Sequence, residues 1–166
     1  MTEEQLADYG EAYQEFMEAV PGLWQKVLDG LNVDDATGDE VVADEKEHVE
    51  LWEKWRTELP EAGDAPRLAE LLDGLVEMGP AELAGALHAY ELQQPEVAET
   101  KKQGLIEHYG FDVDNLEFFD EHAEGEEEHL AFGRKIRDEY ADAEAFTKGF
   151  NRGAELVFHS LDAFVA

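Results

Sequence analysis

Apolar residues recur at the spacing of an α-helix along most of this chain, and this periodicity limits the folds open to it. Near the N-terminus, Leu6, Tyr9, Tyr13, Phe16 and Met17 place an apolar stripe along one side of a helix. No segment shows a convincing strand pattern of alternating apolar and polar residues, and no internal repeat is visible. The sequence therefore predicts an all-α protein.

Helix start and stop signals divide the chain into segments. Thr2 followed by Gln5 forms a capping-box pattern, which satisfies exposed amides at a helix start. Pro21 predicts a break that leaves a short second helix, and Pro95 predicts the end of a later helix or a kink in it. Gly110 is typical of a helix C-terminus. The predicted helices cover residues 3–20, 21–31, 41–59, 67–78, 79–94, 95–109, 116–142 and a last segment that ends at 164.

Seven or eight helices with short connections predict a bundle in which inward-facing side chains from several helices can meet. A chain of 166 residues, 43% of them hydrophobic, is long enough to bury a core and short enough for one domain. We expect a single all-helical domain over residues 1–166, with a central site geometrically available.

The chain is strongly acidic, with 42 Asp and Glu against 12 Lys and Arg and a formal net charge of −30. Such a charge repels phosphate backbones and anionic membrane surfaces, so we expect neither nucleic acid nor membrane as a partner. Because the charge is spread along the chain, it is typical of the acidic surface of a halophilic protein. The absence of cysteine excludes disulfides, thiolate metal sites and a cysteine nucleophile. With no signal peptide and no long apolar run, we expect a cytoplasmic location.

One segment, EHAEGEEEHLAF, carries His122, Glu126 and His129 at i, i+4 and i+7. On one helix these side chains share a face, where two imidazoles and a carboxylate can hold a divalent metal. Glu45 and His48 repeat the Glu-x-x-His pattern of di-iron bundles. Since 42 of 166 residues are acidic, a carboxylate near a histidine is also expected often by chance. From spacing alone, a metal site and a solvated acidic face both remain open.

A second group lies in ALHAYELQQPEVAETKKQGLIEHYGF. Glu91 stands in an apolar helical run there, either as a ligand or as an ordinary surface acid. Lys101 and Lys102 stand out because lysine is rare in this chain. A lysine near buried carboxylates can have a shifted pKa and act as an amine, and the alternative is a solvated surface pair.

The combination AYELQQPEVAETKKQGLIEHYGF, followed by FFDEHAEGEEEH, resembles the heme-oxygenase-like bundle superfamily, which includes the TenA/Thi-4 proteins and the pyrroloquinoline-quinone synthases. It is most similar to the branch named after the Chlamydia protein associating with death domains, from about residue 4 to the C-terminus. The shared features are the pair Tyr90 and Glu91 followed by Gln and by Pro95, and a lysine ten residues past the glutamate, Lys101. The His-x3-acid-x2-His motif has Glu126 in place of the usual aspartate.

The resemblance implies an oxygen-activating centre of two iron ions, with manganese as an alternative metal. The segment DEKEHVELWEKW resembles the histidine-containing helix of the family, matched by His48. The family's sixth ligand is a glutamate ahead of a glycine-containing turn, and here VDDATGDE offers Asp34 or Asp35, with Glu45 as a helical alternative. A shorter aspartate would displace the carboxylate and weaken one metal position. The implied ligands are Asp34 or Asp35, His48, Glu91, His122, Glu126 and His129.

That branch is associated with making para-aminobenzoate for folate by oxidising one of its own tyrosines, with the lysine as amino donor. The resemblance implies an oxidoreductase in which Lys101 is the donor and Tyr90, beside a ligand, is a candidate catalytic residue. The family's first helix, which carries the usual tyrosine, has no match in this sequence.

The implied partners are dioxygen and either an internal tyrosine or an unknown small molecule. Superfamily precedent implies a homodimer. One alternative is a TenA-like protein that binds a small molecule without metal catalysis, and another is a non-enzymatic helical interaction protein. The cysteine-dependent thiaminase mechanism is excluded, because the chain has no cysteine.

Overall fold

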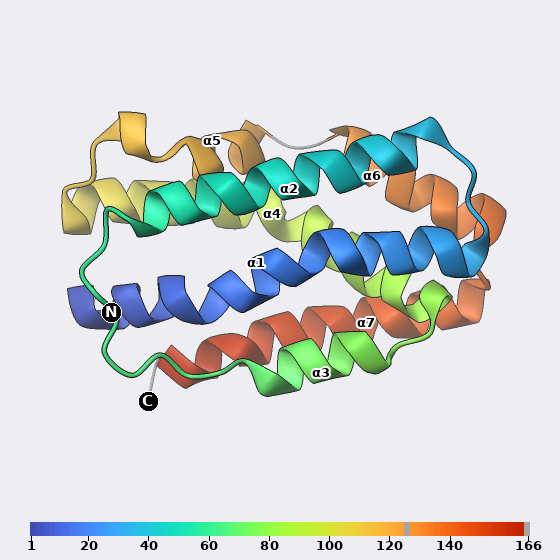
Figure 1. Ribbon diagram of the computed structural model, residues 1–166, viewed down its shortest axis with the longest axis horizontal. Coiled ribbons are helices and arrows are strands. Elements are labelled where there is room, and N and C mark those ends of the chain that lie inside the picture. The colour runs from blue at the N-terminus through green and yellow to red at the C-terminus, as the bar shows by residue number, and fades with distance from the viewer. Residues whose placement is uncertain (125–126, 165–166) are drawn as a thin grey trace.

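The computed structural model describes residues 1–124 and 127–164, and most of them lie in helices. The helices run along the long axis of the molecule, and α1 begins at the end where α7 finishes (Figure 1). No strand occurs within the described ranges, so the prediction of an all-α protein is confirmed. The α-helices are α1 (Glu3–Leu31), α2 (Ala36–Arg56), α3 (Ala69–Glu77), α4 (Pro80–Tyr109), α5 (Glu117–Glu124), α6 (Glu127–Lys135) and α7 (Ala143–Ser160). Shorter helical segments are η1 (Val113–Asn115), the π-helical η2 (Ile136–Tyr140) and η3 (Leu161–Phe164).

The first helix begins at the predicted capping box and continues through Pro21. Thr2 Oγ1 accepts a hydrogen bond from Gln5 N at 3.1 Å, and Gln5 Oε1 accepts one from Thr2 N at 2.8 Å. The predicted break at Pro21 is wrong, because α1 includes this residue. A proline inside a helix costs about 3 kcal/mol. Val20 and Trp24 beside it are fully buried, and burial of such side chains offsets a cost of this size.

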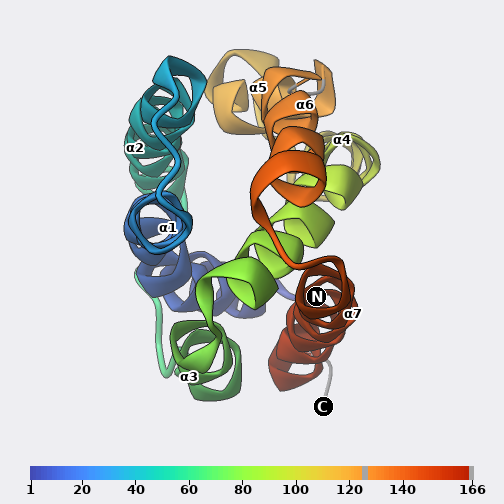
Figure 2. The same cartoon turned by 90° about the vertical axis from the view of Figure 1, so that its right-hand side faces the viewer.

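The long helix α4 runs obliquely through the bundle and contacts α1, α5, α6 and α7 (Figure 2). It includes Pro95, so the alternative that the helix ends there is wrong. Gly110, with a φ of 72°, ends it as predicted. The backbones of α4 and α7 lie very close together where the two helices cross. A methyl group added at Gly85 or Gly149 would overlap backbone atoms of the other helix. This position carries α4 side chains into the centre of the molecule.

The segment predicted as one helix over residues 116–142 is described in three pieces, α5, α6 and η2. Gly125 and Glu126 lie outside the described residues, so continuity between α5 and α6 is not tested. Both helices contact α2 as well as α4. The four helices therefore meet in one region, and the histidines of the predicted site belong to it.

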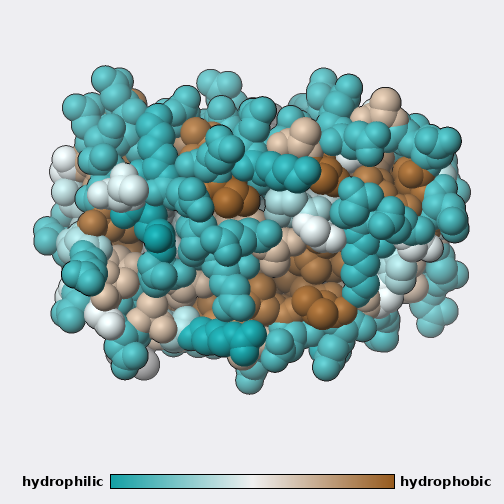
Figure 3. Space-filling model, viewed as in Figure 1, coloured by the Kyte–Doolittle hydropathy of each residue, from teal (hydrophilic) through white to brown (hydrophobic). Residues whose placement is uncertain are grey.

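Aromatic side chains pack between α1, α2 and α5. The ring of Trp52 lies 4.8 Å from that of Trp55 and 5.0 Å from that of Phe118, and its Nε1 donates a hydrogen bond to Gly10 O at 3.1 Å. Hydrophilic side chains cover most of the face shown in Figure 3, with apolar residues visible between them. None of the helices in the described parts of the chain is long and apolar enough to cross a membrane.

Candidate metal centre

Three ionisable side chains from three helices meet in the interior of the bundle. Glu45 of α2, Glu91 of α4 and His129 of α6 are 2%, 4% and 2% exposed. One potential ligand atom from each lies within 4.8 Å of the others. His129 Nδ1 is 3.9 Å from Glu45 Oε1 and 3.9 Å from Glu91 Oε2, so the imidazole faces both carboxylates. The three side chains have the spacing and the chemistry of a metal-binding group.

Two further buried histidines lie beside this group. The ring of His48, one helical turn after Glu45, is 4.4 Å from that of His122 and 6.0 Å from that of His129. His48 Nδ1 is 3.4 Å from Glu45 Oε2, so this carboxylate faces two imidazoles. We call Glu45, His48, Glu91, His122 and His129 the buried cluster.

Hydrogen bonds fix the orientation of two of the imidazoles. His122 Nδ1 lies 2.7 Å from Phe118 O, and since a carbonyl oxygen only accepts, this nitrogen carries the proton. An imidazole protonated at Nδ1 has its lone pair on Nε2, and a carbonyl partner of this kind is typical of metal-binding histidine. His129 Nε2 lies 3.3 Å from Asp44 Oδ2, which leaves its Nδ1 directed at the carboxylates.

The residues present fit a bound cation. Two carboxylates are buried next to each other, and burial of like charges is costly unless a positive charge compensates them. Among the described residues, Glu45 pairs with two histidines and with no lysine or arginine. Glu45 Oε1 is buried and has no hydrogen-bond partner among the described residues. Carboxylate and imidazole ligands together suit iron or manganese.

The structure separates the three candidates for the sixth ligand. Asp35 caps α2 by accepting a hydrogen bond from Thr37 N at 3.0 Å, and its carboxylate also accepts one from Lys135 Nζ. This lysine and the Thr37 amide hold the pKa of Asp35 below its usual value. Asp34 is exposed. Neither aspartate joins the buried cluster, whereas Glu45, the helical alternative, lies within it. Glu126 lies outside the described residues.

Lys101 of α4 contacts a tyrosine that the sequence reading did not single out. Lys101 Nζ donates a hydrogen bond to Tyr9 Oη at 2.5 Å and lies 4.9 Å from the centre of the Tyr9 ring. Loss of solvent lowers the pKa of Lys101, and burial raises the pKa of Tyr9. Lys102, the next residue, instead forms a surface ion pair with Asp120. The apolar stripe on α1 indicated that Tyr9 is buried, but only the packing of α1 on α4 places it at the amine.

Tyr90 precedes Glu91 in α4, and its hydroxyl contacts a thioether. It contacts Met17 Sδ at 3.8 Å, and its ring packs edge-on against that of Phe16 with centres 5.1 Å apart. Burial, followed by the charges of Glu91 and Glu45, raises its pKa well above the usual value. Tyr90 therefore keeps its proton at neutral pH.

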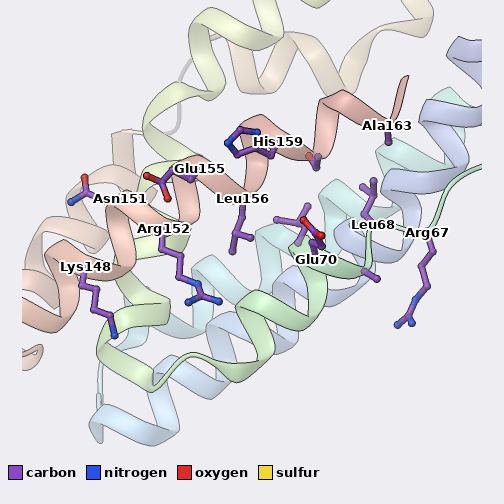
Figure 4. Close-up of a pocket in the computed structure, with 13 residues that line it drawn as sticks. Arg67, Leu68, Glu70, Lys148, Asn151, Arg152, Glu155, Leu156, His159 and Ala163 are labelled. Atoms are coloured by element: carbon purple, nitrogen blue, oxygen red, sulfur yellow. The ribbon is translucent and has the colours of Figure 1, made fainter. Parts of the chain in front are cut away.

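Two surface hollows differ in their relation to the cluster. An acidic hollow of about 460 Å³ reaches His48 and His129 from between α2, α5 and α6, and Asp44 and Glu121 lie on its walls. A larger hollow of about 760 Å³ lies between α3 and α7 (Figure 4) and contains none of the predicted site residues. Of these two hollows, the acidic one reaches the buried cluster.

Known proteins match most of this chain. The family model of iron-containing redox enzymes matches residues 22–158, a range that contains the whole buried cluster and Lys101. The chain is also 25% identical, over a 185-residue alignment, to the 4-aminobenzoate synthase of Chlamydia trachomatis serovar D. That alignment covers 99% of this chain and 80% of the synthase. The helical architecture is the heme-oxygenase-like bundle predicted from the sequence. The chain belongs to the family of iron-containing redox enzymes.

Proposed function

We propose that the protein is an oxygen-dependent oxidoreductase with a centre of two iron ions. The observation that carries this proposal is the buried group of Glu45, Glu91 and His129, which brings two carboxylates and an imidazole together in the interior of the bundle. His48 and His122 extend the group to five ligands. Glu126, three residues before His129, is the sixth ligand in this proposal, and Glu45 takes the place that the sequence reading gave to Asp34 or Asp35.

Iron held there would supply electrons to dioxygen and so make it able to oxidise a nearby organic group. The chain's own part is to fix the orientation of the ligands. Phe118 O holds the proton of His122 at Nδ1, and Asp44 lies at the outer nitrogen of His129. The Phe118 ring lies 4.2 Å from that of His122 and 5.0 Å from that of Trp52, so aromatic side chains pack beside this histidine.

We further propose that the oxidised group is a tyrosine of the chain and that the product is 4-aminobenzoate. The similarity to the chlamydial synthase supports this product, and the contact between Lys101 Nζ and Tyr9 Oη supports Lys101 as the amine and Tyr9 as the tyrosine. The lowered pKa of Lys101 increases the fraction of neutral amine, which is the nucleophilic form. Tyr90 is the alternative tyrosine because it adjoins Glu91.

Metal binding tests the first part of the proposal. Ferrous iron is added anaerobically to metal-stripped protein, and bound iron per chain is measured. Binding should saturate near two ions, and Glu45→Gln should weaken it at least about tenfold, because a ligand charge is lost. Asp34→Asn, at an exposed carboxylate, should leave it unchanged. Unchanged iron binding in Glu45→Gln, or strong loss in Asp34→Asn, would reject this ligand assignment.

Isotope labelling tests the second part. Protein made with tyrosine labelled in its ring carbons and lysine labelled at its Nζ nitrogen is loaded with iron and exposed to oxygen, and the small molecules released are analysed by mass spectrometry. Both labels should appear in 4-aminobenzoate. Lys101→Arg and Tyr9→Phe should each abolish the product, whereas Lys102→Arg should not. If Tyr90→Phe abolishes it and Tyr9→Phe does not, Tyr90 is the tyrosine used. An unlabelled product would reject an internal substrate.

A further inference from the structure

Lys101 borders two adjoining hollows that open to the surface. The inner hollow, of about 190 Å³, reaches Tyr90 and is walled by Trp52 and Phe118, the ring that covers His122. The outer hollow, of about 220 Å³, lies toward Tyr109 and the N-terminus. Tyr9, Lys101, Phe119 and Leu161 border both hollows. Reaction between two side chains that already touch needs no such space.

The walls of these hollows are aromatic and carry hydrogen-bond donors. Tyr13, Trp52, Tyr90 and Phe118 give the inner hollow ring surfaces that suit a planar aromatic molecule. Gln93 lines the inner hollow and Trp55 the outer one, and the buried atoms Gln93 Nε2 and Trp55 Nε1 have no hydrogen-bond partner among the described residues. Buried donors are normally paired, so both atoms are suited to an acceptor on a ligand.

The charge of the hollows is opposite to that of the rest of the protein. Lys101 contributes an amine to both, and no Asp or Glu of the described chain lines either one. Elsewhere the chain carries 42 acidic residues against 12 basic ones. Lys101 Nζ donates one hydrogen to Tyr9 Oη, and its remaining hydrogens can be donated to a carboxylate.

We propose that these hollows bind a free, single-ring aromatic carboxylate, with its ring among the aromatic side chains and its carboxylate at Lys101 and Gln93. Volumes of about 190 and 220 Å³ are smaller than the roughly 300–1,000 Å³ of drug-sized ligand sites, which restricts the ligand to about one ring. The proposal goes beyond the proposed function, because the ligand is a separate molecule. It holds whether or not iron oxidises Tyr9.

Calorimetric titration of the full-length, metal-free chain tests the proposal, with benzoate as the probe. Benzoate should bind at one site per chain and at least about tenfold more tightly than benzylamine. The net charge of −30 favours the benzylammonium cation everywhere else on the molecule, so a preference for the anion identifies this site. Cyclohexanecarboxylate should bind more weakly than benzoate, because it lacks the aromatic face. Equal or tighter binding of benzylamine, or no binding of benzoate, would overturn the proposal.

Substitutions of residues that line the hollows test where benzoate binds. Lys101→Met should weaken benzoate binding about tenfold or more, since a charged hydrogen bond is lost, whereas Lys102→Met should not change it. Val97→Phe adds a ring to the wall of the inner hollow and should also weaken binding while leaving Lys101 in place. Unchanged affinity in both Lys101→Met and Val97→Phe would place the ligand elsewhere and reject the proposal.

Comparison of ligands distinguishes two sources of the carboxylate. If the hollows hold the product of the proposed reaction, 4-aminobenzoate should bind more tightly than benzoate. If they hold another aromatic acid, the amino group should give no advantage. The titration uses no iron, so failure of the labelling experiment leaves its result unaffected, and failure of the titration leaves the labelling result unaffected.

Discussion

Asp35 and Glu45 lie ten residues apart and have different surroundings. The sequence indicated that a carboxylate near this turn joins His48, but it left Asp34, Asp35 and Glu45 as alternatives. Spacing could not decide among them, because the choice depends on distant residues. The Asp35 carboxylate accepts hydrogen bonds from the Thr37 amide and from Lys135, which lies one hundred positions away in the sequence. Glu45, on the same face of α2 as His48, lies in the buried cluster. The assignment of the sixth ligand thus depends on contacts between residues far apart in the sequence, and a single sequence does not reveal these contacts.

Replacement of Asp35 by asparagine should lower the free energy of unfolding at neutral pH. Asparagine also caps helices, so the change removes mainly the charge that faces Lys135. The pKa of Asp35 is lowered in the folded protein, first by the Lys135 hydrogen bond and then by the Thr37 amide. Its charge therefore contributes stability above its unfolded-state pKa, and this contribution is lost as pH falls through the lower folded-state pKa.

Urea unfolding of both proteins between about pH 7 and pH 2 measures this effect. The difference between wild type and Asp35→Asn should be constant at neutral pH and vanish at the acid end. Iron binding by the variant should equal that of the wild type, because Asp35 lies outside the buried cluster. A difference that grows toward low pH would contradict the sign derived for Asp35.

At the scale of helices, the sequence predicted most elements but not their continuity. The capping box at Thr2 and the stop at Gly110 are local hydrogen-bond and backbone features, so sequence alone reveals them. The break at Pro21 was wrong, because the cost of a proline is local whereas the burial of Val20 and Trp24 depends on other helices. The close crossing of α4 and α7 was likewise not predictable from one sequence.

That crossing predicts a strong effect of a single methyl group. A Cβ at Gly149 would overlap the Glu82 backbone of α4, and no side-chain rotation can relieve a clash with backbone atoms. Gly149→Ala should therefore lower the free energy of unfolding by about 3 kcal/mol. Gly22→Ala is the matched control, because no atom lies within 4 Å of the added group. It should raise the free energy of unfolding by about 0.5–1 kcal/mol, since alanine favours the helix. Urea unfolding measures both, and equal effects would contradict the close crossing.

At the scale of the whole molecule, the net charge follows from composition, whereas the proposed site depends on a few buried residues. Composition indicated an acidic protein, and hydrophilic side chains cover most of the face seen in Figure 3. The buried cluster, however, contains only a few of the 42 acidic residues, and composition could not identify them. The motif resemblance named His48, Glu91, His122 and His129 as ligands, with Glu45 as one alternative for the sixth, and these residues lie together in the interior. The contact of Tyr9 with Lys101 was not predicted from the sequence.

The net charge of −30 predicts that salt stabilises the folded protein. Cations are too few to pair with most carboxylates, so repulsion dominates at low ionic strength. Raising the salt from about 0.01 M to about 1 M shortens the screening length from about 30 Å to about 3 Å. The melting temperature should rise on the order of 10 °C if screening contributes a few kcal/mol. Sodium chloride and sodium perchlorate at equal, moderate ionic strength should act alike, because screening depends on charge and not on exclusion of the anion from the surface. A melting temperature that stays constant or falls below about 0.3 M salt would show that repulsion among the carboxylates does not limit stability.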